Sequence, residues 1–163
     1  MNTNELTAKL PLTWEECYAI CRPEELFSQY WETDNIWKSI TKPRVSLRDI
    51  NYKYPRYKHN VYGECEVGVL YFYEWLNYLN SISNINKPLP PQMIGQMAKI
   101  LYSKYYYFYF SDLKLLLEGI LEGKYGHFFG SVDSQLIMTA FKVYDTERRK
   151  LLKELEEEKK KYQ

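Results

Sequence analysis

Apolar side chains recur along this chain at the spacing of an α-helix, and no stretch alternates convincingly with the period of two of a half-buried strand. The clearest example in the N-terminal half is the segment 65–82, whose apolar face is formed by Val69, Phe72, Tyr73, Leu76 and Leu79. We expect short helices before this segment and longer ones after it. The pattern therefore predicts an all-α protein with the architecture of a small helical bundle.

Three helices are predicted in the C-terminal half, and we expect them to form a compact unit. Apolar residues mark one helix from Met93 to Phe108, and a second follows from Leu113 to Glu122. The last helix covers about 133–160 and ends in a charged tail. That tail is expected to project into solvent, because it carries almost no apolar residue that a core would bury.

The ends of these helices carry polar residues that suit capping. Ser111 or Asp112 is placed to cap the second helix, and Asp133 the third. Glycines at 123 and 126 close the second helix, and one of them is expected to adopt a left-handed backbone conformation. The core of the unit is predicted to contain Leu101, Tyr105, Phe108, Leu113, Leu116, Leu117, Ile120, Ile137, Phe141 and Tyr144.

The N-terminal half contains two sequences with the spacing of a capping box. In this motif two residues three positions apart each accept a hydrogen bond, through the side chain, from the backbone N–H of the other. Thr13 with Glu16 predicts a short helix over 14–22, and Ser46 with Asp49 predicts the start of another helix. Residues between these helices, 33–45, are predicted to be irregular.

Two further segments are expected to lack helix. Residues 53–59 are expected to form an extended loop. The prolines of the segment 84–91 end the preceding helix and mark the best internal boundary. We therefore divide the chain into an N-terminal helical region, 1–86, and a C-terminal three-helix unit with its charged tail, 87–163.

Tyrosine is the residue type that stands out in the composition, with 17 copies in 163 residues. Tyrosine offers a large contact area at a low entropic cost, which suits binding interfaces. A general bias in composition gives the same count, so both interpretations stay open. The net charge of +1 predicts no bulk affinity for polyanions.

The distribution of charge is more informative than the total. Residues 1–37 carry seven acidic side chains against two basic ones, and residues 38–59 carry seven basic side chains against Asp49. Such asymmetry can mark a surface for nucleic acid or for an acidic partner. It can equally reflect an attraction between the two segments of the same chain. The candidate nucleic-acid residues are Arg44, Arg48, Lys53, Tyr54, Arg56, Tyr57 and Lys58.

No catalytic or metal-binding pattern is found. Cys17 and Cys21 share a helical face, and Cys65 with His59 could complete a zinc set on paper, but the spacing matches no zinc motif. No nucleophile with a base and no phosphate-binding glycine loop occurs, and capping explains Asp112 and Asp133. We therefore expect no enzyme activity, no cofactor and no metal. The odd number of cysteines, the polar N-terminus and the lack of a membrane-spanning run predict a cytoplasmic protein without membrane contact.

The aromatic run from Tyr102 to Phe110 holds seven aromatic residues in nine positions, too many for all to be exposed. We expect part of the run to build the core and the rest to face a protein partner. A second aromatic group surrounds the glycine turn at 123–130, and its rings are expected to hold the turn against the core, with a role in partner binding as the rival interpretation. The candidate partner-binding residues are Tyr106, Tyr107, Tyr109, Tyr125, Phe128 and Phe129.

Several short motifs in residues 92–149 carry a family resemblance. They are Tyr105-Tyr106-Tyr107, Ser111-Asp112-Leu113, the glycine turn from Gly123 to Asp133, and Tyr144 with Arg148. These motifs resemble a family carried by phages and conjugative elements of the Bacteroides group, whose activity is not established. Phe129 stands where the family more often has tyrosine. The layout of this half is also similar in outline to small helical helicase-loader and helicase-modulator domains of phages.

The resemblance implies an accessory protein of a mobile genetic element that acts by protein–protein contact, with DNA replication as its setting and a replicative helicase as a possible target. One alternative is a nucleic-acid-binding protein that uses residues 38–59. The other is a structural protein that self-associates through the helix at 133–160.

Overall fold

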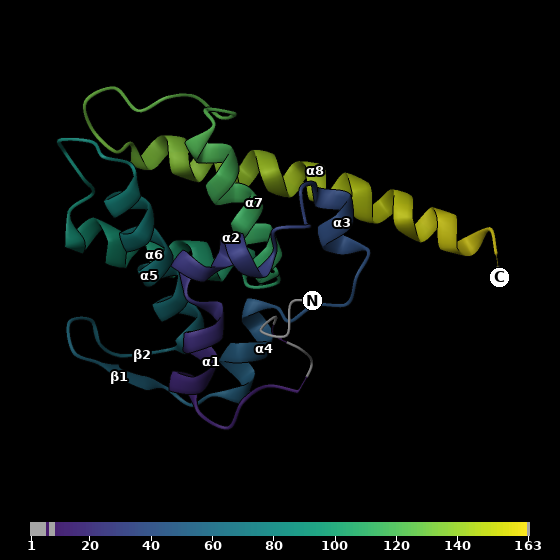
Figure 1. Ribbon diagram of the computed structural model, residues 1–163, viewed down its shortest axis with the longest axis horizontal. Coiled ribbons are helices and arrows are strands. Elements are labelled where there is room, and N and C mark those ends of the chain that lie inside the picture. The colour runs from purple at the N-terminus through teal and green to yellow at the C-terminus, as the bar shows by residue number, and fades with distance from the viewer. Residues whose placement is uncertain (1–5, 7–8, 163) are drawn as a thin grey trace.

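The structure is a computed structural model that describes residue 6 and residues 9–162, and these residues are mostly helical. The chain begins with short helices, continues through a small hairpin and ends with four longer helices (Figure 1). The helical fold class is confirmed. The one addition within the described residues is a two-stranded sheet.

The N-terminal third consists of short helical segments, which are α1 (Trp14–Cys21), the 3-10 helix η1 (Pro23–Glu25), α2 (Leu26–Gln29), α3 (Ile36–Ile40) and α4 (Leu47–Lys53). Both predicted starts are confirmed, because the hydroxyl oxygens of Thr13 and Ser46 accept the N–H groups of Glu16 and Asp49 at 3.2 Å. The prediction that 33–45 is irregular was wrong. The Asn35 side chain caps α3 by accepting the N–H of Lys38 at 2.9 Å.

The predicted extended loop belongs to an antiparallel hairpin of β1 (Tyr57–His59) and β2 (Gly63–Cys65). Each strand has three residues, so the sequence offered no alternation long enough to reveal it. The burial of β1 follows the strand period, since Tyr57 and His59 are half-buried and Lys58 between them is exposed.

The remaining helices are α5 (Val67–Ile82), α6 (Pro91–Tyr105), α7 (Phe110–Leu121) and α8 (Ser134–Lys160). Helix α5 is buried along most of its length and packs against α6, α4 and η1. Helix α8 lies across α7 and α3. All four helices contribute to one core of buried residues, and the division of the chain at residue 86 stays a prediction.

All ten residues predicted for the core are buried. Phe141 of α8 lies at its centre, because its ring contacts four others with centroid distances of 5.2 to 6.1 Å. Those rings come from three other parts of the chain and belong to Phe72, Trp75, Tyr105 and Phe108. Two of them, Tyr105 and Phe108, belong to the aromatic run, so part of the run builds the core, as the sequence predicted.

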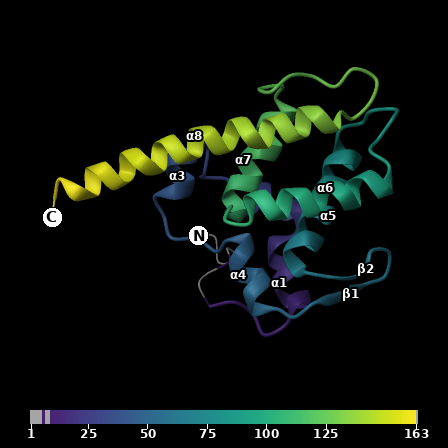
Figure 2. The same cartoon turned by 180° about the vertical axis from the view of Figure 1, so that it is seen from behind.

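The last turns of α8 extend beyond the other helices in both views of the molecule (Figures 1 and 2). Residues 156–162 are exposed, as the sequence predicted. None of the helices in the described residues has the length and apolar composition needed to cross a membrane.

The glycine turn after α7 has the expected backbone, with φ of +79° at Gly123 and +120° at Gly126. Tyr125 and Phe128 pack against the core, as predicted. The expectation for Phe129 was wrong, because its side chain is 88% exposed and does not hold the turn.

Candidate functional site

Asp112 is the most extensively hydrogen-bonded carboxylate in the structure's core, and no part of it is exposed. Its Oδ1 accepts the hydroxyl of Tyr144 at 2.5 Å and that of Ser39 at 2.9 Å. Its Oδ2 accepts the N–H of Tyr109 at 2.8 Å and Nε of Arg148 at 3.0 Å. The predicted N-cap position was wrong, because Tyr109 is the N-cap. Asp112 lies in the first turn of α7 and takes part in its capping box by accepting the Tyr109 N–H.

Ser111, the other predicted cap, is also buried inside this cluster. The oxygens of Ser39 and Ser111 are 2.6 Å apart. Because Ser39 donates its single proton to Asp112, Ser111 is the donor in this second bond. Burial, followed by the negative charge of Asp112, raises the pKa of Tyr144 well above its usual range, so this phenol remains a donor.

Arg148 neutralises the buried carboxylate and is itself only 4% exposed. The carbon at the centre of its guanidinium lies 5.1 to 5.6 Å from the ring centroids of Tyr107, Phe108 and Tyr109. Favourable contact between a cation and ring faces is expected at such distances. We call this cluster of Ser39, Ser111, Asp112, Tyr144 and Arg148 the α3–α7–α8 joint, after the helices that it connects.

The joint brings together residues from separate sequence motifs. Asp112 comes from the motif Ser111-Asp112-Leu113, and Tyr144 and Arg148 come from the last motif of the resemblance. These residues meet in the core, where no solvent reaches the carboxylate. Asp133 lies elsewhere and caps α8 as predicted, accepting the N–H of Gln135 at 2.9 Å. The arrangement supports a role in assembling the fold.

The predicted partner-binding residues form two separate groups. Tyr106, Tyr107 and Tyr109 lie before α7, and the group from Tyr125 to Phe129 lies after it. Helix α7 has 12 residues, so it separates the groups by about 18 Å. Tyr107 donates its hydroxyl to Asp145 at 2.7 Å, and Tyr106 is 38% exposed. The six residues therefore do not make one continuous surface.

Tyr106 instead contacts Arg48, one of the candidate nucleic-acid residues. The guanidinium carbon of Arg48 lies 5.8 Å from the Tyr106 ring centroid. The backbone N–H groups of Leu47 and Arg48 donate to the carbonyls of Phe108 and Tyr106, which fixes the start of α4 on this turn. Tyr52, one turn after Arg48 on α4, is 93% exposed. We call Arg48, Tyr52 and Tyr106 the α4 patch.

The other nucleic-acid candidates lie in several places. Tyr54 is buried and donates its hydroxyl to the carbonyl of Pro11 at 2.6 Å. Arg56 pairs with Glu64 across the hairpin at 3.3 Å. Lys53 at the end of α4 and Lys58 on β1 are exposed, and Tyr57 on β1 is half-buried. Arg44 lines the cleft described next.

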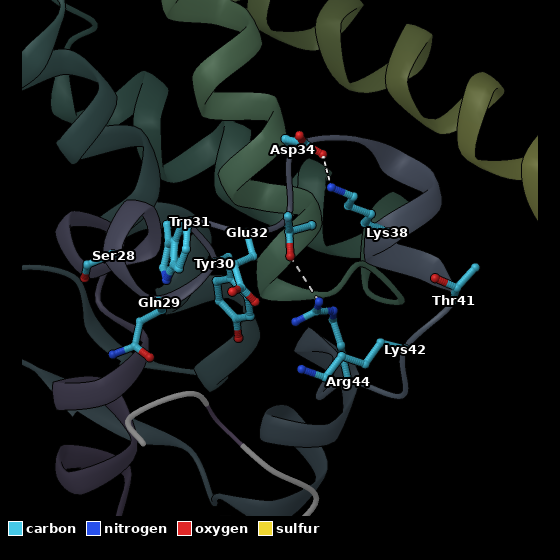
Figure 3. A pocket seen from close by; sticks show the side chains of 11 residues that line it. Ser28, Gln29, Tyr30, Trp31, Glu32, Asp34, Lys38, Thr41, Lys42 and Arg44 are labelled. Carbon is cyan, nitrogen blue, oxygen red and sulfur yellow. Dashed lines mark hydrogen bonds and ion pairs between the residues drawn. The ribbon is translucent and has the colours of Figure 1, made fainter. Parts of the chain in front are cut away.

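A concave surface with a volume of about 1170 Å³ lies between α2 and α3 (Figure 3). Figure 3 shows residues 28–31 along one wall and Lys38 of α3 with Thr41, Lys42 and Arg44 along the other. Trp31 is 65% exposed there. The basic side chains Lys38, Lys42 and Arg44 lie on the second wall. We call this surface the α2–α3 cleft.

The polar contacts of the cleft link it to the joint. Arg44 donates to the Thr33 hydroxyl at 3.0 Å, and the buried Lys114 of α7 donates to the Thr33 carbonyl at the same distance. Lys38 pairs with Asp34 at 2.9 Å, and this bond lowers the pKa of the Asp34 carboxyl. Nothing in the sequence indicated the cleft, because the segment that contains α3 was predicted to be irregular and Trp31 is followed in the sequence by Glu32 and Asp34.

The three cysteines are buried and form no disulfide with one another. Burial raises the pKa of the Cys21 thiol well above its usual range, and its hydrogen bond with Cys17 acts in the same direction. Cys65 is also buried, on β2. Among residue 6 and residues 9–162, no group of three or more His, Cys, Asp and Glu side chains is placed to hold a metal ion.

Comparisons of this protein with protein-family models, with curated proteins and with solved structures found no match. The resemblance to a family of phages and conjugative elements therefore stays a prediction, and the chain's own geometry is what supports a function.

Proposed function

We propose that this chain is a non-enzymatic accessory protein that acts by protein–protein contact, with the α2–α3 cleft as its contact surface. The observation that carries the proposal is the exposed Trp31 at a concave surface of about 1170 Å³. Tryptophan and arginine are enriched among the residues that dominate binding energy at interfaces. The cleft combines both types with two lysines.

The chemistry of the cleft supports a partner segment that carries acidic side chains and an apolar group. Lys38, Lys42 and Arg44 outnumber Glu32 and Asp34 in the lining, and this excess of positive charge complements carboxylates, which speeds association and favours the correct partner. The apolar group of the partner would cover the Trp31 ring. Helices α7 and α8 would act as the rigid support, because they contact each other and because the joint and Lys114 connect α7 to the segment that forms the cleft.

A matched pair of variants tests the proposal. Trp31→Ala removes the proposed anchor, and Tyr52→Ala removes an exposed aromatic side chain outside the cleft. Each full-length protein is immobilised and incubated with a lysate of the source organism, and the bound proteins are identified by mass spectrometry. We expect Trp31→Ala to lose a protein that the unmodified chain and Tyr52→Ala both retain. The same set of proteins on all three would contradict the proposal.

A replicative helicase as the partner, and DNA replication on a mobile element as the setting, rest on the sequence resemblance alone. We propose them as the first identity to look for among the captured proteins. A captured set without any replication protein would remove this part of the proposal and leave the contact surface in place.

Direct binding of single-stranded nucleic acid is the second candidate, and the α4 patch favours it. Tyr52 and Tyr106 expose rings on which bases can stack, and Arg48 lies beside Tyr106 to contact phosphate. The test is the fluorescence anisotropy of a labelled single-stranded oligonucleotide, measured at low and moderate salt. Binding that weakens steeply with salt and is lost in Tyr52→Ala but retained in Trp31→Ala would favour this function over protein contact.

A further inference from the structure

A second cavity, of about 360 Å³, lies between α1, the hairpin and α5 and shares no lining residue with the α2–α3 cleft. Three aromatic side chains line it, those of Trp14, Tyr18 and Tyr57, with the apolar Leu70 of α5 beside them. The volume lies within the range of small-molecule and side-chain pockets. One carboxylate, that of Glu74, lines this aromatic cavity from α5.

Glu74 is held by two neutral groups. The Tyr18 hydroxyl donates to Oε2 at 3.4 Å, and Nε2 of His59 is 3.1 Å from Oε1. The other ring nitrogen of His59, Nδ1, accepts the N–H groups of Val61 and Tyr62 at 3.2 and 3.0 Å. Because Nδ1 accepts two hydrogen bonds, the ring proton is on Nε2, and His59 is a neutral donor to Glu74.

The two groups that hold Glu74 carry no positive charge, so neither of them balances its negative charge. Within the part of the chain that the structure describes, no lysine or arginine forms an ion pair with Glu74. Burial raises the pKa of Tyr18, and the charge of Glu74 raises it further, so the phenol remains a proton donor. The Glu74 side chain is 26% exposed and has acceptor capacity left beyond its two bonds. Glu15 adds a second carboxylate to the lining, and Lys58 adds one positive charge.

We infer that this cavity binds a guanidinium group, presented by an arginine side chain of a peptide. A flat cation stacks on aromatic rings, and its N–H groups donate to a carboxylate in a fixed geometry. A quaternary ammonium has no N–H donor and would leave the remaining acceptors of Glu74 unused. The site is independent of the α2–α3 cleft, so its failure and the failure of the proposed function can be told apart.

The test is a titration of the full-length protein followed by NMR at the indole N–H of Trp14 and the backbone N–H of His59. The probe is N-methylguanidinium chloride, and N-methylurea is its neutral counterpart of similar shape, with sodium chloride as the control for ionic strength. We expect saturable shifts with N-methylguanidinium only. Equal shifts with both compounds, or none with either, would overturn the inference.

Variants sharpen the same titration. Glu74→Gln keeps the shape of the side chain and removes its charge, and we expect at least a tenfold loss of affinity for N-methylguanidinium. Glu15→Gln removes an exposed carboxylate of the same cavity and should change the affinity less than threefold. Equal losses in both variants would contradict the role of Glu74. If Glu74→Gln does not fold, the two probes on the unmodified chain decide the question.

The source of the guanidinium is distinguished by two further probes, free arginine and the capped tripeptide acetyl-Gly-Arg-Gly-amide. The inference expects the tripeptide to bind more tightly, because the zwitterionic backbone of free arginine brings a carboxylate close to Glu15 and Glu74. Tighter binding of free arginine would contradict the peptide assignment.

Discussion

The α3–α7–α8 joint and the α2–α3 cleft share the helix α3 and differ in how their charges are satisfied. The inward face of α3 places Ser39 against Asp112, in a cluster where the carboxylate has four partners and no exposure. The outward face carries Lys38 into an open cleft beside the exposed Trp31, and the Lys38 side chain, which pairs with Asp34, stays about half exposed. Buried, satisfied polar groups stabilise one arrangement of the chain, whereas exposed charges and rings can contact a partner. We therefore propose assembly as the role of the joint and recognition as the role of the cleft.

The largest loss of stability is expected from a substitution at the centre of the joint. Asp112→Ala would leave the buried Arg148 without its counter-ion, and breaking a buried pair in this way costs about 3–5 kcal/mol of the free energy of unfolding. Chemical denaturation followed by circular dichroism measures this loss. A loss of less than about 1 kcal/mol would remove the joint from its role in assembly.

The next largest loss of stability is expected at Tyr144, whose phenol donates a hydrogen bond to the same carboxylate. Tyr144→Phe keeps the ring in the core and removes the hydrogen bond to Asp112, which has a charged acceptor. We expect a loss of about 1.5–3 kcal/mol, the range for hydrogen bonds to charged groups. Tyr125→Phe is a matched control, because the Tyr125 ring also packs on the core without a bond to Asp112. Similar losses in both variants would show that the bond to Asp112 contributes nothing specific.

The sequence predicted the helices and the core because their signals are local. Periodic apolar residues mark α5 to α8, and the capping hydroxyls of Thr13 and Ser46 lie three residues from their targets. Helix α3 has only five residues, which is too short for a periodic signal. The same limit applies to the three-residue strands of the hairpin.

The role of Asp112 illustrates why the candidate site was harder to predict than the fold. Serine or aspartate before a leucine-rich segment has the pattern of an N-cap. The side-chain partners of Asp112 are 32, 36 and 73 residues away in the sequence, at Tyr144, Arg148 and Ser39. No local pattern reports such distant contacts. The α2–α3 cleft depends on the same packing and was missed for the same reason.

A smaller loss of stability is expected at Ser39, the residue that α3 contributes to the joint. Ser39→Ala removes one neutral donor to Asp112 and leaves the ion pair with Arg148 intact. The expected loss is about 1 kcal/mol. Hydrogen exchange at the amides of α3 should speed up more than exchange at the amides of α5. Uniform acceleration over the whole chain would show that Ser39 stabilises the fold as a whole and does not position α3.

The smallest effect on stability is expected in the cleft. Trp31→Ala removes an exposed ring, and exposed substitutions change the free energy of unfolding by less than about 0.5 kcal/mol. Thermal unfolding measures the change. A large drop in the melting temperature would place Trp31 with the joint as a structural residue.

Photo-crosslinking from the cleft tests the division between assembly and recognition most directly. A photoreactive phenylalanine analogue replaces Trp31 in one protein and Tyr52 in another, and each is expressed in the source organism and irradiated. We expect a covalent adduct with another protein from position 31 and none from position 52. Protein adducts from position 52 alone, or from neither position, would contradict the assignment of recognition to the α2–α3 cleft.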